Sequence, residues 1–364
     1  MHYQSNRWRI PRAARGLVIA WMVVLGSART WVPAGDIKLN GDPQLFDVSG
    51  KPGRVVVEPV NGGLRFLEDS RDILTYNRDP ISQSDGRYNR GHYVHPLYDL
   101  DGVRMTDDMP KDHRHHRGVF WAWTQLWIGD KRIGHPWEQK DMAWDVTAMK
   151  VSNAPESATL FTTALWKSPL WLNDKGAEKA IVKETATIRV HASAADARAI
   201  DFEISLLALA SEVRLGGSMS TKGYGGFSVR IPLPSDLKIM GPTGTVEPDG
   251  KRPSPTQPWV DYSAVFGKDG KTTGLTILCH PGNPGFPHGW TIRRAASCQN
   301  PVYPGQKPVA LSTEIPLVLR YRIVLHRDGF DAVRMKKFFE DYEGTVKWNN
   351  LKTPKLYPSS EDEG

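Results

Sequence analysis

Short apolar runs separated by turn residues recur along most of this chain, and they constrain its fold more than any other feature. Each run has the length of a strand, and glycine, proline, asparagine and aspartate stand between the runs. The runs lie at residues 54–60, 118–129, 158–166, 183–192, 199–210, 274–280 and 316–326. Many short strands bounded by turn signals predict an all-β chain that folds as a large antiparallel β-sandwich.

The pattern within the runs adds detail to this prediction. Residues 183–190 alternate between polar and apolar, as expected for a strand with one covered face. Residues 158–166 and 316–326 are more continuously apolar, which favours strands covered on both faces. Residues 328–344 instead carry an apolar stripe at helical spacing and end at Gly344. We therefore expect one C-terminal helix packed against the sheet.

The N-terminal segment differs from the rest of the chain. Arginines precede a short apolar run at residues 16–26, and small residues follow it. This succession is typical of a secretory signal peptide, and the run is shorter than the ~20 residues that a membrane-spanning helix needs. We expect a signal peptide at 1–34, a single β-sandwich domain at 35–348 and a flexible tail at 349–364. The protein would then be exported, periplasmic or secreted, with no integral membrane span after cleavage.

Charge and cysteine content narrow the choice of partners. The formal charge is +7, but beyond the N-terminal segment the basic residues are scattered, which indicates a solvated surface and no nucleic-acid partner. Cys279 and Cys298 are the two cysteines of the chain. An exported protein can pair two such cysteines, and the sequence is equally compatible with two buried thiols.

The segment DHRHHR at residues 112–117 is the densest group of chemically active side chains. In an extended segment His113 and His115 would point to one face, and His116 to the other. Such a pair, with His95 as a third candidate ligand, can hold a divalent metal such as copper or zinc. Without metal, the imidazoles can transfer protons near neutral pH. They can also simply bond to loop carbonyls at the end of a strand.

Aromatic and charged residues elsewhere in the sequence suit a small-molecule or oligosaccharide ligand, because flat apolar rings match the C–H faces of a sugar. The candidate catalytic residues are His95, His113, Glu184 and His280. The candidate substrate-binding residues are His115, His116, Arg117, Trp123, Lys222, Arg230, Trp259, Asn283, Trp290 and Arg293. Each also has a structural interpretation: Glu184 as an ordinary strand residue, Asn283 as a turn residue, and Trp259, with Asp261 beside it, as part of the core.

Several catalytic signatures are missing from the sequence. It contains no G-x-S-x-G elbow, no HExxH motif and no catalytic-cysteine signature around either cysteine. The glycines of TKGYGGFSVRIP lack the spacing of a phosphate-binding loop. Serine-hydrolase, cysteine-protease and zincin chemistry are therefore disfavoured.

Four stretches carry a family resemblance: HPLYDLDGVRMTDDMPKDHRHHRG, GYGGFSVRIP, PWVDYS and HPGNPGFPHGW. Together they resemble the exported bacterial proteins labelled PmoA-like, a family of unknown function, from about residue 54 to about residue 342. The label refers to a multi-span membrane subunit of methane monooxygenase. That meaning does not fit this chain, because no run beyond the leader approaches ~20 apolar residues.

The pattern is also similar to the galactose-mutarotase-like β-supersandwich, which binds sugars with histidines and a carboxylate. This resemblance implies His95, His113 and His280 as polar site residues and Glu184 as an acid/base group. We expect an exported protein that acts on a carbohydrate or glycoside by acid/base chemistry. A histidine-ligated metal protein and a non-catalytic carbohydrate-binding sandwich are the alternatives, and hydrolysis, epimerisation and elimination are all compatible with the sequence.

Overall fold

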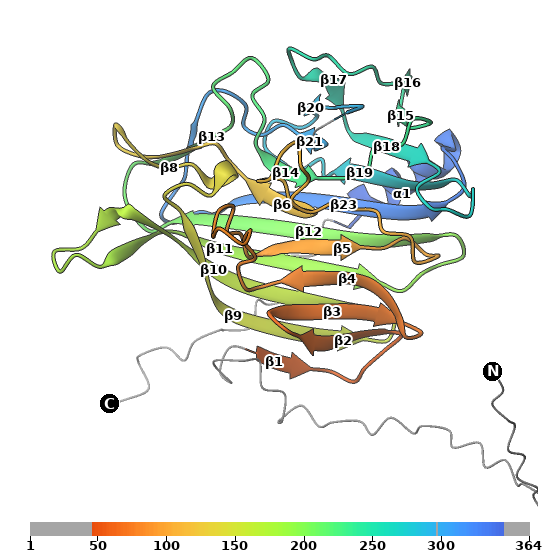
Figure 1. Cartoon of the computed structure of the whole chain (residues 1–364), viewed down its shortest axis with the longest axis horizontal. Helices are drawn as coiled ribbons and strands as arrows, with labels where there is room; N and C mark the ends of the chain where they lie inside the picture. The colour runs from red at the N-terminus through yellow and green to blue at the C-terminus, as the bar shows by residue number, and fades with distance from the viewer. Residues whose placement is uncertain (1–45, 296–297, 346–364) are drawn as a thin grey trace, which may run out of the picture. The chain divides into compact units, whose positions relative to one another are not determined.

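A computed structural model describes residues 46–295 and 298–345, and it confirms an all-β chain of antiparallel sheets with one C-terminal α-helix (Figure 1). The expected signal peptide and the whole of the expected C-terminal tail lie outside the described residues. Within the described part of the chain, no helix is both long enough and apolar enough to cross a membrane.

The larger sheet has ten strands, in the order β1-β9-β10-β11-β12-β23-β19-β18-β15-β16. Their bounds are β1 (Phe46–Ser49), β9 (Ala143–Ala154), β10 (Ser157–Leu172), β11 (Glu178–His191), β12 (Ala197–Ala208), β23 (Leu317–Arg327), β19 (Thr273–Cys279), β18 (Trp259–Ala264), β15 (Lys238–Gly241) and β16 (Gly244–Thr245). Every neighbouring pair is antiparallel except β1 and β9, which run parallel.

A six-stranded sheet in the order β14-β6-β5-β4-β3-β2 packs against it. Its strands are β14 (Gly226–Val229), β6 (Val119–Ala122), β5 (Tyr93–Leu97), β4 (Arg71–Asn77), β3 (Gly63–Glu68) and β2 (Val55–Val60). Two smaller sheets complete the fold: β22 (Val309–Ala310), β13 (Val213–Gly216), β7 (Gln125–Ile128) and β8 (Lys131–Gly134), and then β17 (Ser254–Gln257), β20 (His288–Thr291) and β21 (Asn300–Pro301).

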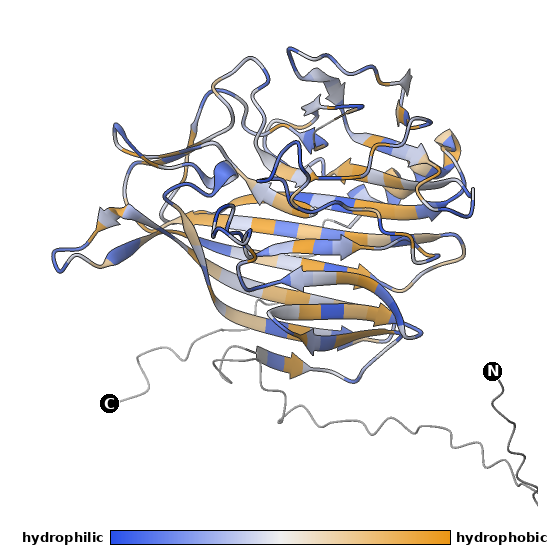
Figure 2. Cartoon of the chain, in the orientation of Figure 1, coloured by the Kyte–Doolittle hydropathy of each residue, from blue (hydrophilic) through white to orange (hydrophobic). Residues whose placement is uncertain are grey.

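The main core lies between the two large sheets. Leu160, Ile188 and Ile204 from the ten-stranded sheet meet Phe66 and Leu74 from the six-stranded sheet, and all five are buried. Apolar and polar residues form alternating bands along the strands (Figure 2), as expected when successive side chains point to opposite faces. Burying this many apolar side chains is the main stabilising contribution to the sandwich.

The run at residues 118–129, expected as one strand, is divided between two sheets. Strand β6 belongs to the six-stranded sheet and β7 to the four-stranded sheet. The break falls at Trp123, whose carbonyl accepts a hydrogen bond from the backbone N–H of Trp137 at 2.7 Å. That bond anchors the short 3₁₀ helix η2 (Pro136–Glu138) beside the end of β6.

Strand β6 also separates the main core from a second, smaller one. Trp121 points into the main core, whereas Phe120 and Ala122 point to the outer face of the six-stranded sheet. There they join Tyr93, Trp137 and Cys298 in a buried cluster. This outer cluster forms an apolar surface against which polar loops pack.

The helix α1 (Ala332–Glu343) confirms the expected C-terminal helix. The side chain of its N-cap residue Asp331 accepts a hydrogen bond from the backbone N–H of Arg334 at 2.7 Å. Its buried residues Met335 and Tyr342 pack against the outer face of the ten-stranded sheet, on a cluster that includes Trp259. The helix therefore covers the face opposite the main core.

The two cysteines lie in different cores. Cys279 is in the main core and Cys298 is in the outer cluster, and both side chains are buried. They are not joined by a disulfide. Burial raises the pKa of the Cys279 thiol well above its ordinary value, which makes a reactive thiolate at this position unfavourable.

Candidate functional site

Residues 109–116 form a closed loop, which we call the histidine loop. The backbone N–H of Met109 donates to the carbonyl of His116 at 3.0 Å, and that of His116 donates to the carbonyl of His113 at 2.9 Å. The segment therefore turns back on itself. The expectation that it is extended, with His113 and His115 on one face, is wrong, because consecutive turns at this point replace the strand geometry.

The turns bring all three loop imidazoles into contact. The rings of His113 and His116 stack with their centroids 4.6 Å apart. The ring of His115 stands edge-on to that of His116, at 4.7 Å between centroids. His116 in turn meets Trp137 edge-on at 5.9 Å. The histidine loop thus rests on the outer apolar cluster through His116, while His113 is its more exposed member, with 39% of its side chain accessible.

Asp112 links this group of rings to a buried arginine. Its carboxylate lies 2.9 Å from Nδ1 of His113 and accepts a hydrogen bond from Arg230 at 3.0 Å. Arg230 extends from the end of β14, and a second of its nitrogens lies 3.5 Å from Nδ1 of His116. The Nε atom of Arg230 is buried without a hydrogen-bond partner. Because Nδ1 of His113 is engaged by Asp112, its Nε2 is the nitrogen left for other contacts.

Burial keeps two of these imidazoles neutral. It lowers the pKa of His116 to about 2, with the nearby imidazoles and Arg230 adding to the effect. It also lowers the pKa of His115 to about 4. For Asp112, burial acts to raise the pKa, but the hydrogen bond from His113 and the charge of Arg230 outweigh it, so the pKa is lowered. At neutral pH the neutral imidazoles of His115 and His116 therefore lie near an ionised carboxylate, that of Asp112.

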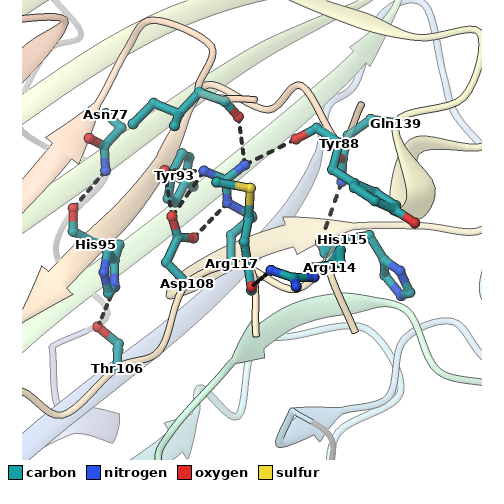
Figure 3. A network of polar contacts seen from close by, with 12 residues as sticks. Asn77, Tyr88, Tyr93, His95, Thr106, Asp108, Arg114, His115, Arg117 and Gln139 are labelled. Atoms are coloured by element: carbon teal, nitrogen blue, oxygen red, sulfur yellow. Dashed lines mark hydrogen bonds and ion pairs between the residues drawn. The ribbon is translucent and has the colours of Figure 1, made fainter. Parts of the chain in front are cut away.

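A second polar network holds the neighbouring loop in place. Arg117 binds Asp108 through two hydrogen bonds of 2.6 and 3.0 Å. It also donates to the carbonyls of Ile81 and Tyr88 at 2.8 and 3.2 Å, and its guanidinium contacts the hydroxyl of Tyr93. Figure 3 shows Arg117 at the centre of this network, with His115 and Tyr88 beside it. All of these contacts are internal, so Arg117, proposed from sequence as a ligand-binding residue, here positions the loops.

His95 lies on the same outer face, next to this network. Its Nδ1 is 3.0 Å from the hydroxyl of Thr106, and its carbonyl accepts a hydrogen bond from Asn77 at 2.7 Å (Figure 3). Burial lowers its pKa. Gly118 packs against it so closely that an added Cβ would stand 2.8 Å from the Cβ of His95. The structure thus places His95 at the edge of the site, hydrogen-bonded to Thr106.

Glu184 lies inside the sandwich instead. It is fully buried, and it accepts hydrogen bonds from the indole N–H groups of Trp166, at 2.7 Å, and Trp121. Nε2 of His92 lies 2.7 Å from the same carboxylate, and the other nitrogen of His92 is 2.6 Å from the hydroxyl of Tyr76. Glu184 and the histidine loop are therefore on opposite faces of the six-stranded sheet.

The remaining candidate residues lie on other parts of the fold. His280 meets Tyr342 of α1 at 5.2 Å between ring centroids, and Asn283 bonds to the backbone of Arg320. Trp123 and Trp290 are buried in the main core, where their indole N–H groups donate to the carbonyls of Tyr303 and Gln257.

The last three candidates lie at separate places. Trp259 packs under α1, Arg293 donates to the carbonyl of Asp249, and Lys222 lies in the loop between β13 and β14. The structure does not bring these residues to the histidine loop.

The sequence reasoning missed Arg90, which the structure places beneath the site. Its guanidinium is almost fully buried, lies over the rings of Phe120 and Trp144, and donates to the carbonyl of Pro136 at 2.7 Å. Burial lowers its pKa to about 9. The segment RGHY at residues 90–93 contributes Arg90, His92 and Tyr93 to three separate networks. In the sequence, the only feature that could have indicated this role is the density of polar residues before a strand.

Across residues 46–295 and 298–345, no group of three or more histidine, cysteine, aspartate or glutamate side chains is arranged to hold a metal ion. His95 and the histidine loop occupy neighbouring positions, and His95 is directed to Thr106.

Fold and site together define an antiparallel β-sandwich with a histidine- and arginine-rich loop on the outer face of its six-stranded sheet. The chain belongs to DUF6807, a family of unknown function whose sequence profile matches residues 64–340. No curated protein matches it. Among solved structures it is similar to galactose 1-epimerase from Lactobacillus acidophilus NCFM, with 10% sequence identity, a TM-score of 0.28, and coverage of 75% of this chain and 98% of that chain.

Proposed function

We propose that this protein acts on a carbohydrate or glycoside, and that the histidine loop supplies the acid/base groups. The observation that carries the proposal is the contact between three imidazoles, one of which is bonded to a carboxylate and left half-exposed. A histidine that only caps the end of a strand needs no more than one ring bonded to one backbone carbonyl. A carboxylate that fixes one nitrogen of a half-exposed imidazole is the arrangement by which proton-transferring histidines are oriented.

The roles follow from the geometry. His113 is the proton-transferring residue, acting through Nε2, because Asp112 engages its Nδ1 at 2.9 Å. The neutral ring of His115 offers a donor or an acceptor to a hydroxyl group. Arg230 is buried beside Asp112 and neutralises it, so its role is to hold that carboxylate against His113.

A sugar is the substrate class that these groups suit. Each sugar hydroxyl both donates and accepts, which matches a mixture of neutral imidazoles, a carboxylate and a guanidinium. Tyr88, whose ring lies 6.4 Å from that of His115, adds a flat apolar surface at the same place. Proton transfer at a hydroxyl or at a carbon beside it is the step shared by epimerisation and elimination.

The N-terminal segment supports a further part of the proposal, that the chain is exported to the periplasm or secreted. We also propose that DUF6807 and the exported PmoA-like proteins are related, on the strength of the four stretches quoted above. One of those stretches contains the whole histidine loop.

The test is a time course followed by proton NMR, in which purified protein is mixed with a panel of free monosaccharides and simple glycosides. This readout detects anomer exchange, epimerisation, elimination and hydrolysis in one experiment. We expect turnover of at least one member, and its loss in His113→Ala. Lys111→Ala, an exposed change in the same loop, is the matched control and should keep the wild-type rate.

Two outcomes would overturn the proposal. Saturable sugar binding without any turnover would indicate a binding module, in which the histidines only order the loop. Turnover that survives in His113→Ala would place the chemistry elsewhere in the fold.

A further inference from the structure

A separate pocket opens on the outer face of the ten-stranded sheet, at its β15–β18 edge. Its volume is about 490 Å³. Its lining residues are Asp236, Lys238, Met240, Ser263, Ala264, Thr272, Gly329 and Phe330. The last two belong to the connection between β23 and α1, so strands form the floor and the approach to the helix forms one wall. None of these residues belongs to the histidine loop.

The strand register explains how this floor is built. His326, Gly274, Ser263 and Lys238 are consecutive cross-strand neighbours on β23, β19, β18 and β15. A Cβ added to Gly274 would stand 2.3 Å from Nε2 of His326 and 2.9 Å from Oγ of Ser263. The imidazole therefore lies across the glycine, in space that any other residue would fill.

This placement lets His326 reach a buried carboxylate. Its Nε2 lies 2.7 Å from Asp261, which also accepts hydrogen bonds from Ser263 at 2.5 Å and Thr276 at 2.8 Å. Arg334 of α1 lies 3.2 Å from the other imidazole nitrogen. The same nitrogen also lies 3.2 Å from the carbonyl oxygen of Arg327. Asp261 and His326 are both fully buried.

The consequence for the pocket concerns the Ser263 hydroxyl. Ser263 is almost completely buried at the floor of the pocket, and its single hydrogen is committed to Asp261, so its oxygen can act there only as an acceptor. At the rim, the exposed side chains of Asp236 and Lys238 carry opposite charges. Phe330, half-buried and packed 6.1 Å from Trp259 between ring centroids, gives one flat apolar wall.

We propose that this pocket binds a neutral, polyhydroxylated ligand, a monosaccharide or the terminal sugar of a glycoside. A ring hydroxyl would donate to Ser263, other hydroxyls would bond to Asp236 and Lys238, and the C–H face of the ring would lie on Phe330. The opposite rim charges favour a ligand without net charge. The volume is in the range of roughly 300–1,000 Å³ typical of small-molecule sites. The chain then has a sugar-binding site independent of the histidine loop.

The experiment is calorimetric titration of the purified protein with D-glucose, D-galactose and D-mannose, and with two charged probes, the zwitterion glycine, which carries both charges, and the inorganic phosphate anion. We expect saturable binding of at least one sugar and none of the charged probes. Ser263→Ala should weaken that binding about tenfold, because one hydrogen bond to the ligand is lost. Phe330→Ala should weaken it by a similar factor, and Ser235→Ala, beside the pocket but outside its lining, should leave it unchanged.

Circular dichroism melting of each variant separates lost binding from lost folding, and Phe330→Ala provides a second test that leaves the buried Asp261 network intact. Titration of His113→Ala distinguishes this proposal from the proposed function, since its affinity at the pocket should equal that of the wild type. The proposal is overturned if none of the three sugars binds, if only glycine or phosphate binds, or if Ser263→Ala and Phe330→Ala both retain wild-type affinity.

Discussion

The imidazoles of His113 and His116 are stacked, 4.6 Å between centroids and 5° from parallel. Two cations cannot stack at this distance without a large electrostatic cost, so the contact itself requires that at least one ring is neutral. His116 is the neutral one, because it is buried and an arginine nitrogen lies 3.5 Å from its Nδ1. His113 is the more exposed of the two rings and the one that Asp112 contacts.

Asp112 should act as a positioning residue for His113. Replacing it by asparagine keeps the size of the side chain but removes the charge that faces Nδ1 of His113 and Arg230. We expect Asp112→Asn to lower kcat by about 10²-fold, the usual contribution of an oriented acid/base group.

Asp112→Glu, which restores the charge, should recover part of the rate. If Asp112→Asn changed KM alone and left kcat where it was, Asp112 would have only a structural role in the loop.

Stability should fall as the solution is acidified. The folded-state pKa of His116 is about 2 and that of His115 about 4, against an ordinary value of 6.5. Below pH 6.5 the unfolded chain therefore binds more protons than the folded chain. The stabilisation is complete above that pH and is lost as the pH falls towards 4, at up to about 1.4 kcal/mol per pH unit for each group. Urea unfolding at a series of pH values measures this slope.

His116→Gln removes one of the two groups, so its slope between pH 6.5 and 4 should be smaller than that of the wild type. Equal slopes in the two proteins would show that His116 is already protonated in the folded state near neutral pH.

The buried carboxylate of Glu184 should be essential for stability. Glu184→Gln places an amide N–H₂ among the indole donors of Trp121 and Trp166, so at least one buried donor loses its acceptor. We expect a loss of about 3 kcal/mol in the free energy of unfolding. Glu178→Gln, an exposed change on the same strand, is the control and should be nearly neutral. A neutral effect of Glu184→Gln would contradict this stabilising role.

Gly274 should be a position where even alanine is costly. The added Cβ would overlap the ring of His326, at 2.2 Å from its Cε1. Displacing that ring breaks its contact with Asp261, so Gly274→Ala should destabilise the fold by about 2–3 kcal/mol. Gly250→Ala, whose Cβ meets nothing within 4 Å, is the control. Thermal melting of the two variants compares them directly, and equal melting temperatures would contradict the close packing.

Periodicity was sufficient to predict the class of fold, because strand-length apolar runs and one capped helix are local features. The composition of the sequence also indicated the histidine loop, since five of the six residues from 112 to 117 are histidine or arginine. It did not predict which distant residues join that loop. Arg230 reaches it through the pairing of β14 with β6, and Arg90 through packing on Phe120. Such contacts depend on register and topology, which no local pattern specifies.

The same limit explains the candidates that lie elsewhere. His280 and Glu184 have the residue types of an active site, but alternation along their strands sends one to the α1 face and the other into the core. A shift of one residue in either strand would reverse its direction. The pocket at Ser263 could not be predicted from the sequence, because its serine, glycine and histidine lie on three separate strands and form no sequence motif.

The most direct test of the account is the NMR time course on the sugar and glycoside panel, run side by side for the wild type, His113→Ala and Lys111→Ala. The account predicts a new or exchanging sugar species with the wild type and Lys111→Ala, and only the uncatalysed background with a correctly folded His113→Ala. Identical time courses for the wild type and His113→Ala would contradict it.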